Sequence, residues 1–260
     1  MNHPASPAKL PWVLRLPGWA RIGLVIVLVV TFWDLLVRLT GLPHFILPSP
    51  WRVAQALYNN AALIGEHALT TLAEVLLGML VGTLFGIMTA LQLAHSPTAR
   101  AIMRPVLVFS QAIPVFALAP IFTLWLGYGM ASKIAVALLI IYFPVTSAFF
   151  DGLVNTPRGY LDQARIMGAS RWTILTRVRI PAALPSLGSG LRLAAVYAPI
   201  GAVIGEWVGA SSGLGYLMLL ANGRVKIDLM FASLIVLAFM SVTLHWLVDR
   251  LAARKLDSQQ

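Results

Sequence analysis

Six long apolar stretches constrain this chain more than any other feature of its sequence. They run over 22–39, 68–93, 103–126, 133–154, 187–209 and 229–251. A helix needs about 20 residues to cross the hydrocarbon core of a membrane. The 260 residues are 59% hydrophobic and only 11% charged, whereas a soluble domain has about 25% charged residues. We therefore expect an all-α membrane protein with six transmembrane helices.

The segments outside these stretches are short. We expect a single six-span domain over 22–252, between an N-terminal tail of 1–21 and a C-terminal tail of 253–260. No small-x-small cleavage pattern follows the first stretch, so it is predicted to be a retained span rather than a signal peptide. Ser49 is suited to a helix N-cap and Pro50 to the first helical position. This pair predicts a short interfacial helix over 50–64.

The basic residues predict how the chain lies in the membrane. A net charge of +10 would suggest nucleic-acid binding in a soluble protein, but membrane proteins gather Lys and Arg in their cytoplasmic loops. Most of the 19 Lys and Arg residues lie in the two tails and in the segments after the second and fourth spans. These segments share one side. Both termini and the loop over 155–185 are therefore predicted to be cytoplasmic, with no nucleic-acid partner.

Small residues and prolines indicate how the spans pack. Two glycine series recur at four-residue spacing: Gly78, Gly82 and Gly86 in the second span, and Gly201, Gly205 and Gly209 in the fifth. Such series let helices approach closely. Packing within the chain is the favoured interpretation, and a subunit interface is the alternative. Pro114 and Pro120 are expected to kink the third span, because proline breaks helical hydrogen bonding.

Few ionisable residues lie within the spans, and each should face protein or water. Asp34 and Arg38 are four residues apart, which favours a pair on one helix. Glu74 and Arg192 lie near the predicted membrane boundaries, where their side chains are expected to snorkel towards water. For Glu206 two roles stay open: a hydrogen bond between helices, or a part in the transport pathway or its gate.

The cytoplasmic loop is more structured than a connector requires. Thr156-Pro157 predicts a helix start, with Thr156 as the cap. Gly168 then permits a sharp exit, since glycine tolerates positive φ. Ser170 is predicted to cap a second short helix that runs through 178 and stops at Pro181. Along the first helix, helical spacing places Tyr160, Leu161, Ala164 and Met167 on one face.

This loop resembles the EAA loop of ABC-importer permeases. The family pattern is Glu-Ala-Ala, three residues, Gly, nine residues and Ile-x-Leu-Pro. The matching positions here are Asp162, Gln163, Ala164, Gly168, Val178, Ile180 and Pro181. Asp replaces Glu and Gln replaces the first Ala of the triplet. The resemblance implies that the helix inserts into a groove on a cytoplasmic ATPase subunit.

The resemblance extends over about 45–250. The segments 47–53, 111–129 and 213–218 are similar to the nitrate/sulfonate/taurine branch of these permeases, and 71–78 and 198–224 are similar to permeases for thiamine-precursor pyrimidines. Sulfonate permeases tend to have a basic residue at the position of Glu74. The resemblance favours a pyrimidine substrate, with sulfonate, taurine or nitrate as the runner-up. Candidate pathway residues are Gln111, Pro114, Phe116, Tyr197, Glu206 and Trp207.

Missing sequence motifs exclude several other functions and make one more, ion-coupled transport, the less favoured alternative. The chain has no G-x-x-x-x-G-K-[ST] phosphate loop, so ATP and Mg are expected on a partner ATPase, with no cofactor on this chain. It has no cysteine, its five histidines lack metal-ligand spacing, and no nucleophile motif occurs. No catalytic or metal-binding residue is therefore predicted. An ion-coupled secondary transporter is the rival, but it would need more acidic groups at membrane depth than Glu206.

For this six-span chain, with its short interfacial helix and its loop helices, the resemblance implies a type I ABC importer permease fold in which the loop helices are cytoplasmic coupling helices. The resemblance implies four kinds of partner besides the lipid bilayer: two ATPase subunits, an extracytoplasmic solute-binding protein and a second copy of the chain. The expected location is the inner membrane of a bacterial cell.

Overall fold

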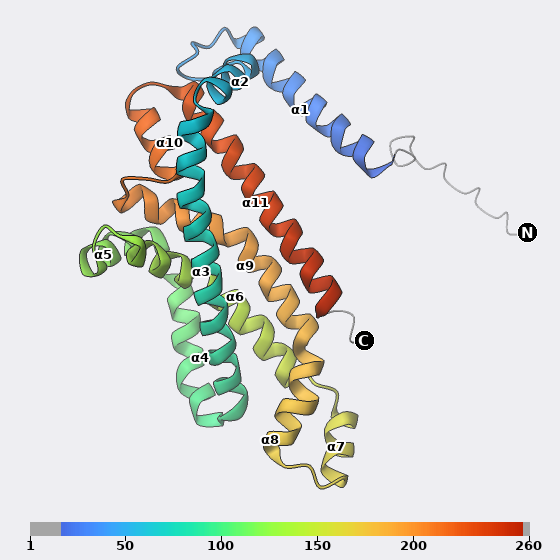
Figure 1. Ribbon diagram of the computed structural model, residues 1–260. Coiled ribbons are helices and arrows are strands. Elements are labelled where there is room, and N and C mark those ends of the chain that lie inside the picture. The colour runs from blue at the N-terminus through green and yellow to red at the C-terminus, as the bar shows by residue number, and fades with distance from the viewer. Residues whose placement is uncertain (1–16, 257–260) are drawn as a thin grey trace, which may run out of the picture.

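The computed structural model describes residues 17–256, and these are helical with short connections (Figure 1). The predicted tails over 1–21 and 253–260 lie largely outside the described residues. In chain order the elements are α1 (Gly18–Thr40), α2 (Pro50–Asn59), α3 (Ala61–His95), α4 (Pro97–Ala112), α5 (Val115–Leu126), α6 (Met130–Val154), α7 (Arg158–Ile166), α8 (Arg171–Ile174), the π-helical segment η2 (Leu175–Arg179), α9 (Ile180–Gly209), α10 (Leu214–Gly223) and α11 (Ile227–Lys255). The predicted all-α class is confirmed.

The described helices match the expected spans except at the third. Five are long and apolar enough to cross a membrane, and α4 with α5 makes a sixth only if the bent pair counts as one span. We expected a kinked helix over 103–126, but the chain bends by 101° between α4 and α5. Ile113 is extended at this point, with φ −84° and ψ 122°. The following Pro114 explains the break, because it disfavours helical backbone at the residue before it.

The predicted interfacial helix is right at its start and wrong at its end. The Ser49 hydroxyl accepts a hydrogen bond from the Arg52 amide at 3.4 Å, and Pro50 occupies the first turn, as expected. However, α2 ends at Asn59, and 61–64 belong to α3. The cause is Asn60, whose backbone is non-helical and whose side-chain amide donates to the Ala56 carbonyl at 2.8 Å.

Helix α6 forms the centre of the bundle, between α3 and α9. Glycines make both contacts close. A Cβ built on Gly78 would lie 2.7 Å from the Ala137 Cβ, and one on Gly201 would lie 2.8 Å from the Ala137 Cα. The same closeness holds along each series, where Gly82 meets Ile141, Gly86 meets Val145, Gly205 meets Lys133 and Gly209 meets Thr123 of α5. Both series therefore lie at helix contacts inside one chain.

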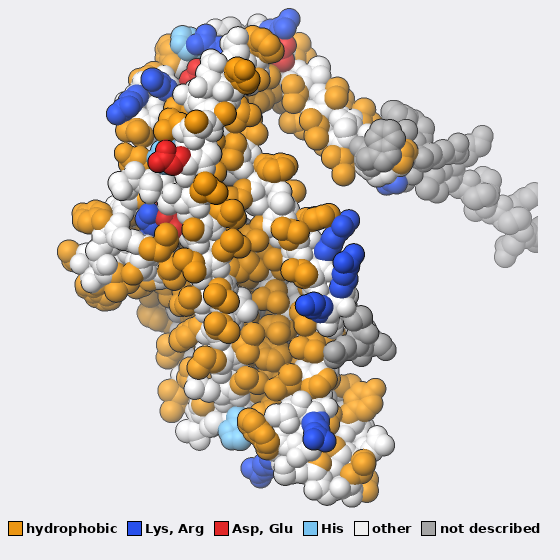
Figure 2. Space-filling model, viewed as in Figure 1, with side chains coloured by type: hydrophobic (Ala, Val, Ile, Leu, Met, Phe, Trp, Pro, Cys, Tyr) orange, Lys and Arg blue, Asp and Glu red, His pale blue; other side chains and the backbone are white. Residues whose placement is uncertain are grey.

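The remaining helices are arranged around this centre. Figure 1 shows α2 and α10 at one end of the molecule and α7 and α8 at the other. Figure 2 shows hydrophobic side chains over most of the surface between these ends, as expected for a lipid-facing belt. Helix α1 diverges from the bundle, and its apolar window has no buried residue. Its predicted pair is present, with Arg38 Nε 2.7 Å from Asp34 Oδ2.

Candidate docking loop and buried polar network

The first helix of the loop begins one residue later than a Thr156 cap would place it. Helix α7 starts at Arg158 after Pro157, and no side chain caps it. The Thr156 hydroxyl instead donates to the Leu153 carbonyl at 3.2 Å. The predicted cap is wrong because Thr156 lies two residues after the end of α6, where the free carbonyls of the last helical turn are within reach of its hydroxyl. Leu161 is buried and holds α7 against the rest of the chain.

The glycine corner has the predicted geometry. Gly168 has a φ of +77°, which side-chain-bearing residues rarely adopt. Its amide donates to the Arg165 carbonyl at 2.9 Å, and the next amide, that of Ala169, donates to the Ala164 carbonyl at 3.0 Å. Ser170 then caps α8 by accepting from the Thr173 amide at 3.1 Å. The corner and the second cap are therefore confirmed.

The second loop helix does not stop at Pro181. Helix α8 runs through η2 into α9, so that residues 171–209 form one continuous helical segment of 39 residues. In η2 the Ile180 amide donates to the Leu175 carbonyl, five residues back. Pro181 lies in the first turn of α9, where the wider π turn accommodates a residue that has no amide proton. The predicted stop is wrong because local backbone geometry absorbs the proline.

Four of the seven predicted docking residues, Gln163, Ala164, Val178 and Pro181, line a groove of about 630 Å³ between α7 on one side and η2 with the start of α9 on the other. Tyr160, Gln163, Ala164 and Met167 line it from the loop side, and Arg177, Val178 and Pro181 line it from the other. Asp162 is exposed and pairs with Arg165, Nη1 to Oδ1 at 2.8 Å. Ile180 instead packs against the main core. Of the family-pattern positions, four thus line the groove and Ile180 packs in the core, while Asp162 is exposed and Gly168 forms the corner.

The loop also exposes large apolar side chains outside the spans. Ile166 is 88% exposed, Met167 78% and Trp172 66%. A connector that met only water would have no need of such residues, and contiguous exposed apolar surface is typical of interaction sites. Together with the groove, this surface can receive a protein partner.

At the opposite end of α9, Glu206 is at the centre of a buried hydrogen-bond network. Its side chain is 1% exposed. One carboxylate oxygen accepts from the Thr71 hydroxyl at 2.6 Å, and the other accepts from the amides of Gly215 and Tyr216. Anionic groups are stabilised at such a position, the N-terminus of a helix. Glu206 therefore fixes α10 to α9 and α3, as the first of its two predicted roles requires.

Two further bonds hold the loop that leads into α10. The Leu214 amide donates to Thr71 Oγ1 at 2.7 Å, and the Gly213 amide donates to His67 Nδ1 at 3.0 Å. Gly213 has a φ of +111°, and a Cβ there would collide with the Glu206 carboxylate. Sequence reasoning did not single out Thr71 or His67, because their partners lie 135 to 146 residues away along the chain.

Glu74 was expected to reach towards water, and this prediction is wrong. Its side chain is 1% exposed, and its Oε1 lies 2.6 Å from Nζ of Lys133 on α6. Lys133 is also buried, although its position at the start of the fourth stretch resembled a loop cation. Because charges removed from water need a partner, this pair joins α3 to α6. Glu74 and Lys133 lie in the first half of α3 and of α6, and Glu206 lies near the end of α9, so all three are towards the same side of the membrane. This shared depth is a signal in the sequence that could have paired Glu74 with Lys133.

Arg192 is likewise bound rather than free at a membrane boundary. Its Nε lies 2.6 Å from Oδ1 of Asp249 on α11. The expected snorkelling is therefore replaced by an ion pair between α9 and α11. Lys133 in α6 and Arg192 in α9 are thus each paired with a carboxylate.

The candidate pathway residues divide into two environments. Gln111, Phe116, Tyr197 and Trp207 are accessible on α4, α5 and α9, and Pro114 marks the α4–α5 break. Glu206 is enclosed by its hydrogen bonds. The structure therefore does not bring Glu206 to the same surface as its neighbour Trp207.

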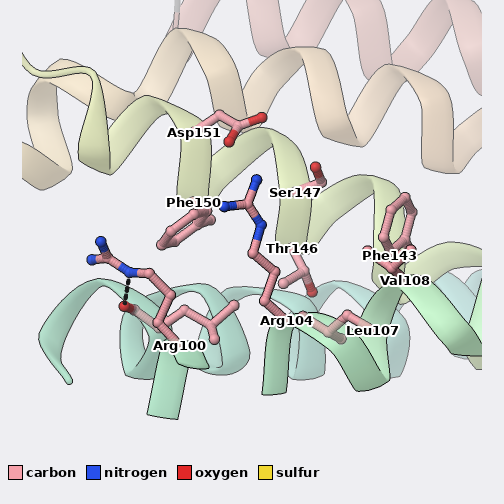
Figure 3. A pocket seen from close by; sticks show the side chains of 10 residues that line it. Arg100, Arg104, Leu107, Val108, Phe143, Thr146, Ser147, Phe150 and Asp151 are labelled. Carbon is pink, nitrogen blue, oxygen red and sulfur yellow. Dashed lines mark hydrogen bonds between the residues drawn. The ribbon is translucent and has the colours of Figure 1, made fainter. Parts of the chain in front are cut away.

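A small pocket of about 130 Å³ lies where α4 meets α6 (Figure 3). The Nε of Arg100 donates to the Leu93 carbonyl at 3.2 Å, and its guanidinium lies 5.1 Å from the centre of the Phe150 ring. Figure 3 shows the Arg104 side chain extending from α4 towards Asp151 of α6. The two Arg100 contacts hold this end of α4 against α3 and α6. Within the described residues, no group of three or more His, Asp or Glu side chains could hold a metal ion.

Comparisons with known proteins agree with this architecture. Residues 82–257 match the family model described as binding-protein-dependent transport system inner membrane component. A probable ABC transporter permease protein of Haemophilus influenzae is 51% identical over 231 residues, which cover 89% of this chain and 94% of the relative. The formylaminopyrimidine transport permease protein ThiX of Halalkalibacterium halodurans is 39% identical, with 74% of this chain and 77% of that protein covered.

The fold is also similar to solved structures. The methionine ABC transporter MetNI in inward-facing conformations matches 80% of this chain and 97% of its own, with a TM-score of 0.55 and 19% identity. An amino acid ABC transporter, whose crystal structure is described as with histidines, matches 77% of this chain and 97% of its own, with a TM-score of 0.62 and 16% identity. The chain belongs to the binding-protein-dependent transport system inner membrane components, the permease subunits of ABC importers, which have no ATPase site of their own.

Proposed function

We propose that this permease carries a small heteroaromatic compound into the cell, with a hydroxymethylpyrimidine-type thiamine precursor as the best candidate. The observation that carries this proposal is the sequence identity to relatives whose names state different substrates. ThiX, named for formylaminopyrimidine, is 39% identical, and the riboflavin permease RibX of Chloroflexus aurantiacus is 38% identical. The taurine permease TauC of Escherichia coli is 29% identical. The two relatives named for flat heterocycles are thus closer than the one named for a sulfonate.

The ion pairs support the same choice. A path for anions is expected to offer basic groups to its cargo. Lys133 in α6 is buried against Glu74, and Arg192 in α9 is held by Asp249. The accessible candidates Gln111, Phe116, Tyr197 and Trp207 instead offer aromatic faces and hydrogen-bonding groups, which suit a flat heterocycle.

In the proposed assembly, the groove-bearing loop docks on an ATPase. The exposed Ile166, Met167 and Trp172, together with the groove, support this contact. Each chain contributes one such loop, so a second copy would supply the other for a pair of ATPase subunits that bind ATP and Mg. The loop and both termini would face the cytoplasm, and an extracytoplasmic binding protein would deliver the solute to the α2 and α10 end. Membership of an ABC importer family decides against an ion-coupled secondary transporter.

A competition assay on the importer in proteoliposomes tests the substrate. With binding protein outside and ATP inside, labelled hydroxymethylpyrimidine should accumulate, and unlabelled pyrimidine precursor should suppress that uptake. Riboflavin and taurine serve as the matched competitors. If taurine or another alkanesulfonate is accumulated and the pyrimidine is not, the substrate assignment is wrong while the permease assignment stands.

A further inference from the structure

The far side of the docking loop carries a second pocket whose chemistry differs from that of the groove. It has a volume of about 540 Å³ and lies between the end of α3 and the α7–η2 segment. His95, Arg165, Arg171 and Arg179 line it together with Ala94, Ala169, Ile174 and Leu175. The lining thus includes three guanidinium groups and an imidazole, and no carboxylate.

One of these arginines is incompletely satisfied in the described part of the chain. The Nε of Arg179 is shielded from solvent and has no hydrogen-bond partner there. A buried donor without an acceptor is unfavourable, so an acceptor oxygen brought by a ligand would stabilise it. Arg179 lies deeper than Arg171, which is exposed at the rim. The pocket therefore has an unsatisfied donor at its more buried side, its floor, and an exposed cation at its rim.

The described ion pairs leave most of this charge uncompensated. Asp162 pairs with Arg165 at 2.8 Å, so that Arg165 is already partly neutralised. His95, Arg171 and Arg179 have no carboxylate partner among the described ion pairs. A ligand with several acceptor oxygens and a negative charge would satisfy the two free guanidinium groups, because Arg forks match phosphate geometry.

We propose that this pocket binds a phosphate group, and that its occupant is the headgroup of an anionic phospholipid. The pocket opens where the long apolar helix α3 ends, and its apolar lining, Ala94, Ile174 and Leu175, can receive the glycerol and the first acyl carbons. Basic pockets at the ends of membrane helices are established headgroup sites. A bound lipid would tie the docking loop to the membrane surface and restrain its movement. Only the choice of the inner leaflet rests on the proposed function.

Native mass spectrometry of the purified permease, titrated with phosphatidylglycerol, tests the site. Arg171→Gln removes the rim cation without touching the core, and Arg179→Gln removes the floor donor. Each should weaken the tightest lipid-binding step by about tenfold or more, since hydrogen bonds to charged groups are the strong ones. Arg158→Gln is the matched control, because it removes an exposed cation of the same loop outside the pocket. It should leave that step unchanged.

Phosphatidylcholine and inorganic phosphate distinguish the sources of the phosphate. Phosphatidylcholine should bind at least tenfold more weakly, and inorganic phosphate at millimolar concentration should not displace phosphatidylglycerol. If inorganic phosphate displaces it fully, the occupant is a soluble phosphate compound and the lipid assignment is wrong. If both pocket variants bind phosphatidylglycerol as the wild type does, the site does not exist. Two results together would assign the pocket to the ATPase subunit instead: adding that subunit releases the lipid, and the subunit binds the Arg171→Gln permease more weakly than the wild type. The pocket would then receive an acidic segment of the ATPase subunit. None of these readings depends on transport.

Discussion

The ion pair between Glu74 and Lys133 offers the sharpest test of how this bundle is held together. Both side chains are nearly inaccessible, at 1% and 6% exposed, and Nζ lies 2.6 Å from Oε1. Removing one partner leaves the other charge buried and unpaired, which costs about 3–5 kcal/mol. For a protein of this size such a loss lowers the unfolding temperature by about 10 °C. Glu74→Leu and Lys133→Met should each show this loss.

The double variant separates the pair from its individual side chains. When both charges are replaced by apolar groups, no buried charge remains unpaired, and much of the lost stability should return. The measurement is thermal unfolding in detergent, followed by fluorescence-detected size exclusion. Arg38→Gln is the matched control, because its pair with Asp34 is exposed and such pairs contribute about 0–1 kcal/mol. Additive losses in the double variant would refute the reasoning.

Three glycine substitutions probe the other contacts. Gly168→Val should strain the positive-φ corner and reduce ATPase copurification while membrane insertion stays normal. The control is Gly159→Val in α7, where an added Cβ meets no other atom. Equal copurification of the two variants would contradict the docking role. Gly205→Leu should lower detergent stability, because even its Cβ would lie 3.1 Å from an α6 Cα; unchanged stability and uptake would show that the ridge faces lipid. Gly213→Ala should displace the Glu206 carboxylate and raise hydrogen exchange over 210–223, and wild-type exchange there would contradict the network.

Features set by local sequence were predictable. Apolar length located the spans, because a membrane helix needs a nearly fixed number of apolar residues. Ser49 and Ser170 acted as caps, and Gly168 adopted positive φ, because each of these preferences depends on only a few neighbouring residues. The family-like spacing in the loop then correctly identified an importer permease.

Features set by tertiary packing were not predictable in the same way. Proline removes a hydrogen bond wherever it occurs, yet Pro114 breaks the chain by 101° while Pro181 is absorbed into a continuous helix. The backbone before each proline differs: Ile113 is extended before Pro114, whereas the π turn of η2 precedes Pro181, and residue type alone does not predict which will form. Similarly, Glu74 could be matched with Lys133 only once α3 was known to pack on α6. Comparing the depths of charged residues in different spans would have brought the two together.

The continuous helix through α8, η2 and α9 connects the docking loop with the Glu206 network. Its 39 residues span about 58 Å at 1.5 Å per residue. Pro185 and Pro199 interrupt its hydrogen bonding, but Gly190 and Gly201 bring its backbone against α6, where added Cβ atoms would lie 3.0 and 2.8 Å from the nearest atoms. A helix packed so closely cannot bend freely without moving α6. A displacement of the loop should therefore move α6 and α9 together, and α10 should follow through Glu206.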